Sequence, residues 1–144
     1  MELSEMMAHV AIQDTQAHYV KWADGGRPAE FASLFTEDCV YTVVDRVVHG
    51  RAGVEAFLAE MIVAFTAHPT SGRLRHHLSS VVIDLVSPAE ARATAYFMAV
   101  GPHGPDHWGN YRDRLVKVGE RWLFAERRVQ IDGRLDNSVA TTVD

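Results

Sequence analysis

The order of the predicted elements constrains this chain more than any other feature, because helical segments come first and four strand-like segments follow. The strand-like segments span 74–86, 91–100, 108–118 and 121–131, and turn residues such as Ser87-Pro88 and Gly119-Glu120 separate them. Consecutive strands joined by short turns pair antiparallel. The sequence therefore predicts a mostly antiparallel sheet with helices packed on one face, which is an α+β fold.

The first half of the chain predicts the helices that cover this sheet. A first helix begins near Ser4 and ends at about Ala23, before the helix-breaking Gly25-Gly26-Arg27-Pro28. A short helix over 29–35, a strand over 40–44, a return strand over 47–49, a second long helix over 54–65 and a loop over 69–72 follow. A curved sheet with a helix across its concave side forms a cone, and such a cone tends to contain a pocket.

Composition limits the classes of protein to which the chain can belong. Its 144 residues predict one domain over 1–144, with a core at about 8–131 and a polar tail over 133–144 that we expect to be mobile. A formal net charge of -5 and the lack of a visible basic face argue against a nucleic-acid partner. The single Cys39 excludes an internal disulfide and a Cys-based metal cage, and it is expected to be a small buried hydrophobe. No apolar run approaches a membrane span and no signal peptide is apparent, so we expect a cytoplasmic protein.

Two residues far apart in the sequence are the leading candidates for chemistry. Asp24 ends the first predicted helix and His76 opens the first long strand. If the fold brings them together, the carboxylate can hold the imidazole in one tautomer and raise its basicity, as in a general base. His76 and His77 face opposite sides of a strand, and periodicity does not decide which one faces a pocket. An acidic residue before Gly25 is also ordinary turn chemistry.

In the order and spacing of several short segments, the chain resembles the SnoaL-like group of the nuclear transport factor two-like superfamily over about residues 8–131. The segments are Ile12-Gln13-Asp14, 19–24, 31–38 (FASLFTED), His49-Gly50-Arg51, 75–80, 109–113 and 121–124. The resemblance implies a cone of curved antiparallel or mixed sheet closed by the N-terminal helices, a cystatin-like α+β barrel. Enzymes of this group include polyketide cyclases, scytalone dehydratase, bile-acid dehydratase, ketosteroid isomerase and hexachlorocyclohexane dehydrochlorinase.

The resemblance also implies roles for individual residues. It implies that Asp24 and His76 form a catalytic pair, and it favours His76 over His77. Tyr19 and Tyr41 match pocket tyrosines of bile-acid dehydratase, so we predict that both join the catalytic residues. Members of the group often carry Asn four residues after the histidine, where this chain has Ser80, so a contact with the substrate is expected to differ there.

Three further residues are predicted to contact a substrate together with Ser80. His107 and Trp108 follow the Gly/Pro-rich segment 101–105, which is expected to line the pocket mouth, and Tyr111 follows on the third strand. Asp113 shares the strand face of Tyr111, but we favour an ion pair between Asp113 and a neighbouring arginine. The candidate arginines are Arg112, Arg114, Arg127 and Arg128. The spacing of the histidines, including His103, matches no metal motif, so no metal is predicted.

The sequence therefore predicts a cofactor-independent lyase of the dehydratase type that acts on a small hydrophobic polyketide-, steroid- or terpenoid-like substrate. An isomerase or a cyclase could use the same residues. Because many relatives keep the cone and do no known chemistry, a small-ligand-binding or structural protein is a further alternative. The last strand carries Trp122 and Phe124 on one face and Leu123 and Val129 on the other. These apolar groups predict a homodimer or a higher homo-oligomer.

Overall fold

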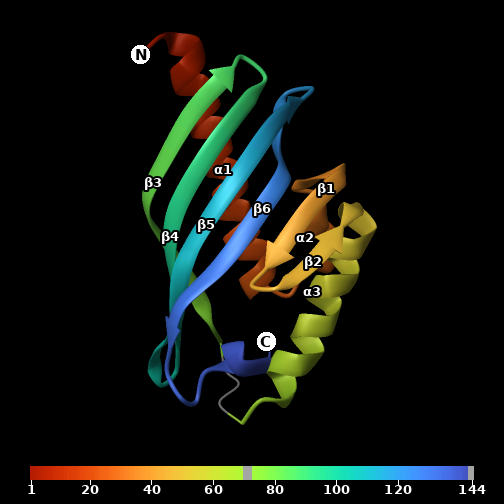
Figure 1. Ribbon diagram of the computed structural model, residues 1–144, viewed down its shortest axis with the longest axis vertical. Coiled ribbons are helices and arrows are strands. Elements are labelled where there is room, and N and C mark those ends of the chain that lie inside the picture. Colours follow the sequence, from red (N-terminus) through yellow and green to blue (C-terminus); the bar gives the residue numbers. More distant parts are fainter. Residues whose placement is uncertain (70–72, 143–144) are drawn as a thin grey trace.

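The structure, a computed structural model, describes residues 1–69 and 73–142, and its elements follow the predicted order (Figure 1). The elements are α1 (Leu3–Asp24), α2 (Pro28–Ala32), β1 (Phe35–Val43), β2 (Arg46–His49), α3 (Gly50–Ala67), β3 (Arg75–Ser87), β4 (Glu90–Gly101), β5 (Gly104–Val118), β6 (Arg121–Arg134) and the 3-10 helix η1 (Val139–Thr142). Except for Pro69, the loop predicted over 69–72 lies outside the described residues.

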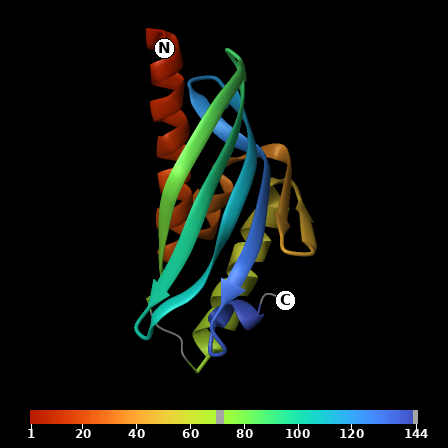
Figure 2. The ribbon, with the colours of Figure 1, turned by 60° about the vertical axis from the view of Figure 1, so that its left-hand side comes forward.

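Six strands form one mixed sheet in the order β2-β1-β6-β5-β4-β3. The four long strands pair antiparallel as predicted, and β1 joins them by pairing parallel with β6. The long strands curve around α1, and α3 lies beside β1 and β2 (Figures 1 and 2). No ladder joins β2 to β3 in the described part of the chain, so the sheet forms an open cone. The predicted α+β cone is therefore confirmed.

Several element boundaries differ from those predicted. The first helix begins at Leu3, because the carboxylate of Glu5 accepts a hydrogen bond from the backbone N–H of Glu2 and closes a capping box with Glu2 as the N-cap, two residues before Ser4. The short helix ends at Ala32, since Phe35 already begins β1. Within the segment 101–105, only Pro102 and His103 form the turn between β4 and β5, and Gly104 begins β5 at a φ of 104° that favours glycine.

The C-terminal segment packs against the cone, whereas the sequence predicted a mobile tail from residue 133. Strand β6 continues to Arg134, and Ser138, Val139 and Ala140 are all buried. The hydroxyl of Ser138 and the backbone N–H of Val139 donate hydrogen bonds to the carboxylate of Asp106 in β5. Polar residues therefore anchor this segment, which is why its composition resembled that of a free tail.

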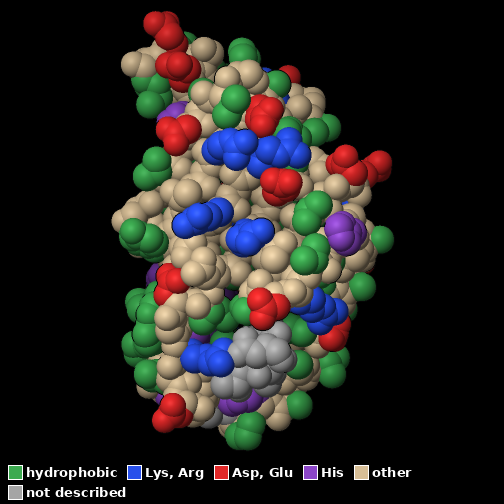
Figure 3. Space-filling view, viewed as in Figure 1, with side chains coloured by type: hydrophobic (Ala, Val, Ile, Leu, Met, Phe, Trp, Pro, Cys, Tyr) green, Lys and Arg blue, Asp and Glu red, His purple; other side chains and the backbone are tan. Residues whose placement is uncertain are grey.

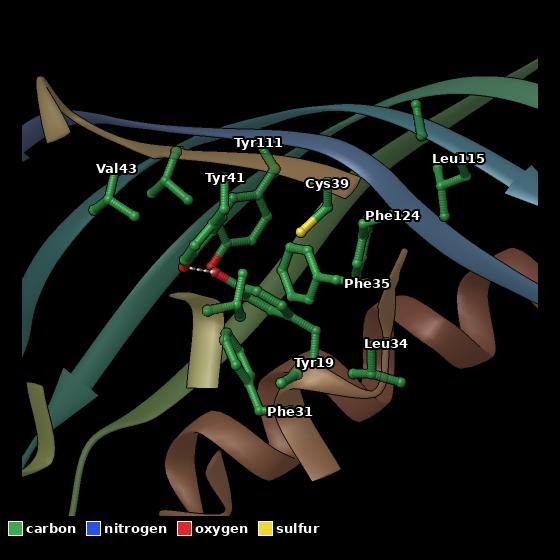
Figure 4. Packing of buried hydrophobic residues seen from close by; sticks show 14 of the residues in the cluster. Tyr19, Phe31, Leu34, Phe35, Cys39, Tyr41, Val43, Tyr111, Leu115 and Phe124 are labelled. Carbon is green, nitrogen blue, oxygen red and sulfur yellow. Dashed lines mark hydrogen bonds between the residues drawn. The ribbon is translucent and has the colours of Figure 1, made fainter. Parts of the chain in front are cut away.

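The core lies between the concave face of the sheet and the helices. Aromatic rings fill it, and Figure 4 shows Tyr19 of α1 reaching toward Tyr41 of β1, with Phe35 and Cys39 close by. Cys39 is fully buried, as a small hydrophobe would be. The apolar residues of β6 on which the predicted association rested are also buried within this chain. They are Trp122, Leu123, Phe124 and Val129.

On the outer face of the sheet, exposed apolar side chains lie on strands other than β6, the strand on which the predicted association rested. Tyr96, Met98 and Trp108 of β4 and β5 are exposed there. Arginines of β4, β5 and β6 gather on the same face, where Lys and Arg side chains lie over the long strands (Figure 3). They are Arg92, Arg112, Arg114 and Arg128. No helix among the described residues is both long enough and apolar enough to cross a membrane.

Candidate active site

The fold brings Asp24 and His76 together at the wide end of the cone. The Nδ1 of His76 lies 2.6 Å from Oδ1 of Asp24, and the backbone N–H of His76 donates to Oδ2 of Asp24 at 3.0 Å. An ionised carboxylate only accepts hydrogen bonds, so in the neutral imidazole the Nδ1 of His76 carries the proton and its Nε2 is the acceptor. The side chain of His76 is 20% exposed and that of Asp24 is 9% exposed. This is the geometry of a general base held by a carboxylate.

The position of Asp24 in the helix disfavours the negative charge of its side chain. It is the last residue of α1, where the negative end of the helix dipole disfavours a carboxylate. Two hydrogen bonds from His76 offset that repulsion.

A bulge in β3 decides which histidine faces the cone. The pairing of β3 with β4 shifts between Ser79 and Val82, and Ser80 has a φ of 49°. As a result, His76 lies on the same inner face of the sheet as Val81 and Ile83. Strict alternation would have placed Val81 and Ile83 on the other face. His77 and Ser80 are both exposed. The predicted contact of Ser80 with a substrate is therefore absent from this geometry, because the bulge turns its side chain outward.

A cavity of about 100 Å³ opens beside the pair. This is space for several waters or for part of a small organic molecule. The walls are mainly apolar, with Phe57, Met61 and Phe65 among them, and His76 and His107 are part of the lining. A second hollow of about 270 Å³ lies against Asp24 and shares His76, Met61 and Phe65 with the cavity.

Two phenols meet at the inner end of the cavity. The hydroxyls of Tyr19 and Tyr41 lie 2.7 Å apart and point toward each other (Figure 4). Burial raises the pKa of Tyr19, although nearby Arg127 opposes this, and burial raises the pKa of Tyr41 well above its usual value. Both groups therefore keep their protons at neutral pH and can donate hydrogen bonds. Tyr111 also lines the cavity, stacked on Phe97 with ring centroids 4.7 Å apart.

A buried ion pair supports these phenols from the narrow side. Arg127 donates to both carboxylate oxygens of Asp113, at 2.7 and 2.8 Å, and both side chains are fully buried. The guanidinium carbon of Arg127 lies 4.2 Å from the ring centroid of Tyr19 and 4.0 Å from that of Tyr111. Burial disfavours the charge on Arg127, but Asp113 outweighs burial and raises the pKa of the guanidinium. The structural interpretation of Asp113 thus agrees with the geometry.

A second aspartate–histidine pair lies beside the first on the inner face of the sheet. The Nδ1 of His107 lies 2.7 Å from Oδ2 of Asp106, and the ring centroids of His107 and His76 are 5.8 Å apart. The sheet register explains this approach, because Ala99 of β4 pairs with His76 on one side and His107 on the other. Its small side chain leaves room above β4 for both imidazoles.

The structure therefore gathers most of the predicted residues and separates two. Tyr19, Tyr41, His76, His107 and Tyr111 line the cavity, and Asp24 holds His76. Ser80 and Trp108 lie outside it. Trp108 is 38% exposed on the outer face, since side chains alternate along β5 and its neighbour His107 points inward.

Sequence reasoning missed Asp106 and the lining ring of Phe97, and it left Arg127 as one of four possible partners of Asp113. Asp106 sits beside a Gly/Pro-rich turn, where an aspartate is unremarkable. In the described part of the chain, no three His, Cys, Asp or Glu side chains are grouped so that they could hold a metal ion.

Comparison with known proteins identifies a family and several similar folds. The family model described as SnoaL-like domain matches residues 4–128. No curated protein matches the sequence significantly. A crystal structure from Novosphingobium aromaticivorans, provisionally assigned as a scytalone dehydratase, is 27% identical, with a TM-score of 0.82 over 94% of this chain and 91% of that chain.

More distant structures share the fold. ActVI-ORFA from Streptomyces coelicolor is 23% identical, with a TM-score of 0.72 over 87% of this chain and 97% of that chain. The hexachlorocyclohexane dehydrochlorinase LinA-type3 from Novosphingobium barchaimii is 16% identical, with a TM-score of 0.78 over 94% of this chain and 93% of that chain. A cystatin-like protein of unknown function from Nostoc punctiforme is 16% identical, with a TM-score of 0.77 over 89% of this chain and 93% of that chain. The fold is therefore shared by enzymes and by proteins without an assigned activity.

Proposed function

The chain belongs to the SnoaL-like family, and on this basis we propose that it is a cofactor-independent lyase that removes water from a small hydrophobic substrate. One observation carries the proposal: the carboxylate of Asp24 holds the Nδ1 of His76 at 2.6 Å while His76 lines an open, mainly apolar cavity. A purely structural cone has no need for an oriented imidazole in a cavity. The similar structure assigned as a scytalone dehydratase supports the same reaction class.

The proposed reaction begins with proton transfer from carbon to His76. The substrate is a β-hydroxy carbonyl compound whose acidic C–H lies next to the carbonyl group. The Nε2 of His76 removes that proton, and Asp24 stabilises the resulting imidazolium. The electron pair of the C–H bond forms a carbon–carbon double bond as the hydroxyl leaves. The imidazolium returns its proton to the departing hydroxide, so one water and one conjugated carbonyl compound are formed.

The tyrosine pair supplies the electrophilic half of this mechanism. As proton abstraction proceeds, negative charge builds on the carbonyl oxygen of the substrate. Tyr19 and Tyr41 remain protonated, because burial raises the pKa of each, and one of their hydroxyls donates to that oxygen. The hydrogen bond between the two hydroxyls lets the second phenol strengthen the donor.

The cavity sets the substrate class. Its apolar and aromatic walls favour a cyclic, hydrophobic skeleton of the polyketide, steroid or terpenoid kind, while the few polar groups are the histidines at the wide end and the tyrosines at the inner end. Isomerisation or ring closure would use the same first step and differ in where the proton returns. Dehydration is preferred because the imidazole that takes the proton stays next to the leaving group.

The exposed outer face of the sheet supports self-association. Tyr96, Met98 and Trp108 form an exposed apolar patch on β4 and β5, and we propose that a second copy of the chain covers it. Replacing Met98 with Asp should then lower the molar mass measured by light scattering from that of an oligomer to that of a monomer. An unchanged mass would place the contact elsewhere.

The test of the proposed function is turnover of cyclic β-hydroxy ketones, followed by the absorbance of the conjugated product. The wild-type protein should accelerate water loss, and His76→Ala should remove nearly all of that activity while leaving the circular dichroism spectrum unchanged. The matched control is His77→Ala, which alters the neighbouring, outward-facing histidine and should retain activity. Equal losses in the two variants, or full activity in His76→Ala, would overturn the assignment of the base.

A further inference from the structure

The side chain of Asp106 contacts three segments of the chain at the cavity mouth. It is fully buried in β5, and each carboxylate oxygen meets two donors. Its Oδ2 accepts from the Nδ1 of His107 at 2.7 Å and from the hydroxyl of Ser138. Its Oδ1 lies 2.9 Å from the Nε2 of His103 and 3.3 Å from the backbone nitrogen of Val139. The turn between β4 and β5, the cavity histidine and the C-terminal segment therefore share one carboxylate.

These four donors differ in whether they can change roles. The backbone N–H of Val139 can only donate. The hydroxyl of Ser138 can rotate to accept, and either imidazole can move its proton to the other nitrogen. An ionised carboxylate suits all four as donors, and it fixes the proton of His107 on Nδ1. The hydrogen bonds from Ser138, His107 and Val139 outweigh burial and hold the pKa of Asp106 below its usual value, so the carboxylate is ionised.

We propose that Asp106 is a positioning residue that fixes the tautomer of His107 and couples it to the buried C-terminal segment, so that the Nε2 of His107 accepts a hydrogen bond from a hydroxyl group of the substrate. The part that concerns the substrate rests on the proposed function, whereas the tautomer and the coupling do not. Ala140 of the C-terminal segment lines the same cavity as His107. Asp106 thus secures one wall of the cavity and orients the acceptor in that cavity at the same time.

The surroundings of His107 agree with a neutral acceptor. Burial lowers the pKa of His107, Asp106 opposes that effect, and the nearby His76 adds to it. A neutral imidazole with its Nδ1 proton on Asp106 leaves an electron pair on Nε2. The two histidines then have different functions. His76 accepts a proton from carbon, whereas His107 accepts a hydrogen bond from a hydroxyl group. The substrate class is accordingly a cyclic ketone that carries a hydroxyl group at its His107 end.

The first test is the ¹⁵N spectrum of the histidine side chains in the wild-type protein near neutral pH, with His107 assigned by comparison with His107→Gln. The expected result is a neutral His107 protonated on Nδ1. A His107 protonated on Nε2 alone, or on both nitrogens, would overturn the proposal. This measurement needs neither a substrate nor a variant of Asp106, so it stands even if the protein is not a lyase.

The second test uses Asp106→Asn, with Ser138→Ala as the matched control. Because Val139 can only donate, the amide oxygen of the variant should face Val139 and its NH₂ group should face His107. The proton of His107 should then move to Nε2, as happens when an amide replaces the carboxylate of a catalytic triad. Ser138→Ala keeps the carboxylate and should keep the Nδ1 proton. An unchanged tautomer in a folded Asp106→Asn protein would overturn the proposal.

Amide exchange and kinetics test the coupling. Exchange at Val139 should rise by roughly tenfold or more in Asp106→Asn, since its charged acceptor is lost. If Asp106→Asn does not fold, Ser138→Ala carries this test through faster exchange at Val139, because it removes one of the two hydrogen bonds by which Asp106 holds the C-terminal segment. Unchanged exchange would overturn the coupling.

Where turnover is measurable, the losses in Asp106→Asn and His107→Gln should not add in the double variant, because one acts through the other. Additive losses would give Asp106 a merely structural role. A protein with the expected tautomer and exchange but no turnover would contradict the proposed function and leave the positioning role intact.

Discussion

The two ends of the cone use buried ionisable groups in different ways. At the narrow end, Arg127 and Asp113 are fully buried and bind each other through two hydrogen bonds. At the wide end, Asp24 and Asp106 each bind one nitrogen of an imidazole, and the other nitrogen is left for the cavity.

This difference separates stability from chemistry. An ion pair in the core holds its two strands in one arrangement, and removing one partner leaves the other as an uncompensated buried charge. A carboxylate that holds an imidazole by one edge leaves a reactive nitrogen, and altering Asp24, whose two hydrogen bonds both come from His76, should cost less stability. Variants at the narrow end should therefore unfold the protein, and variants at the wide end should inactivate it.

The largest effect is expected from Asp24→Asn. The backbone N–H of His76 can only donate to residue 24, so the amide NH₂ should face Nδ1 and move the imidazole proton to Nε2. Turnover should fall by roughly 10³- to 10⁴-fold, as for a triad with the wrong tautomer. The control is Asp14→Asn, an exposed aspartate of the same helix. Steady-state kinetics and thermal unfolding check both variants. A large loss of stability with full activity per folded molecule would reverse the comparison.

The next effect is on stability at the narrow end. Arg127→Met should lower the free energy of unfolding by about 3–5 kcal/mol, because Asp113 is left as an uncompensated buried charge. Urea titration measures this change. Arg128→Met, at the adjacent exposed position, should stay within about 0.5 kcal/mol of the wild type. Equal changes in the two variants would show that the buried pair carries no special weight.

A smaller effect on turnover is expected from the phenols. Tyr41→Phe removes one hydroxyl of the pair with Tyr19 and should lower kcat by roughly 10²-fold, the usual cost of one donor to a developing oxyanion. Tyr96→Phe removes an exposed hydroxyl and is the control. Burial raises the pKa of Tyr19 and Tyr41, so the activity of the wild-type protein should not decline through phenol ionisation below about pH 10.

The smallest expected effect is a pH dependence of stability due to His107. Burial lowers the pKa of His107 in the folded state. Below about pH 6.5, where a free histidine gains its proton, the unfolded chain binds more protons than the folded one. Stability should therefore fall as the pH drops from about 6.5 toward the lower folded pKa, by at most about 1.4 kcal/mol per pH unit. Urea titrations at several pH values should show less of this slope in His107→Gln. An identical slope would mean that His107 is not the group responsible.

The fold was largely predictable because the order of the elements and the turn residues are local signals. The pairing of β1 with β6 was not, since it joins residues such as Tyr41 and Arg127 that lie far apart in the sequence. The boundary of β5 was missed because Gly104 allows a tight turn that resembles a longer break. The buried tail was missed because its anchor, Asp106, is a polar residue on a distant strand.

The candidate site was predictable where resemblance named residues and failed where local geometry intervened. Asp24 and His76 meet as the resemblance implied. Ser80 does not reach the cavity, because a bulge with a positive φ at a serine has no clear sequence signal. Only one member of the Asp106–His107 pair was predicted. His107 was expected near the pocket, but nothing in the sequence indicated that Asp106 would hold it.

The central claim is that His76 moves a proton at carbon, and hydrogen–deuterium exchange tests it most directly. A cyclic ketone such as 2-tetralone is incubated with the protein in D₂O, and loss of the proton signal next to the carbonyl is followed by NMR. This requires no leaving group and no knowledge of the natural substrate. The account predicts accelerated exchange by the wild type and by His77→Ala, and exchange at the buffer rate with His76→Ala or Asp24→Asn. If His76→Ala accelerates the exchange as much as the wild type does, the result would contradict the account.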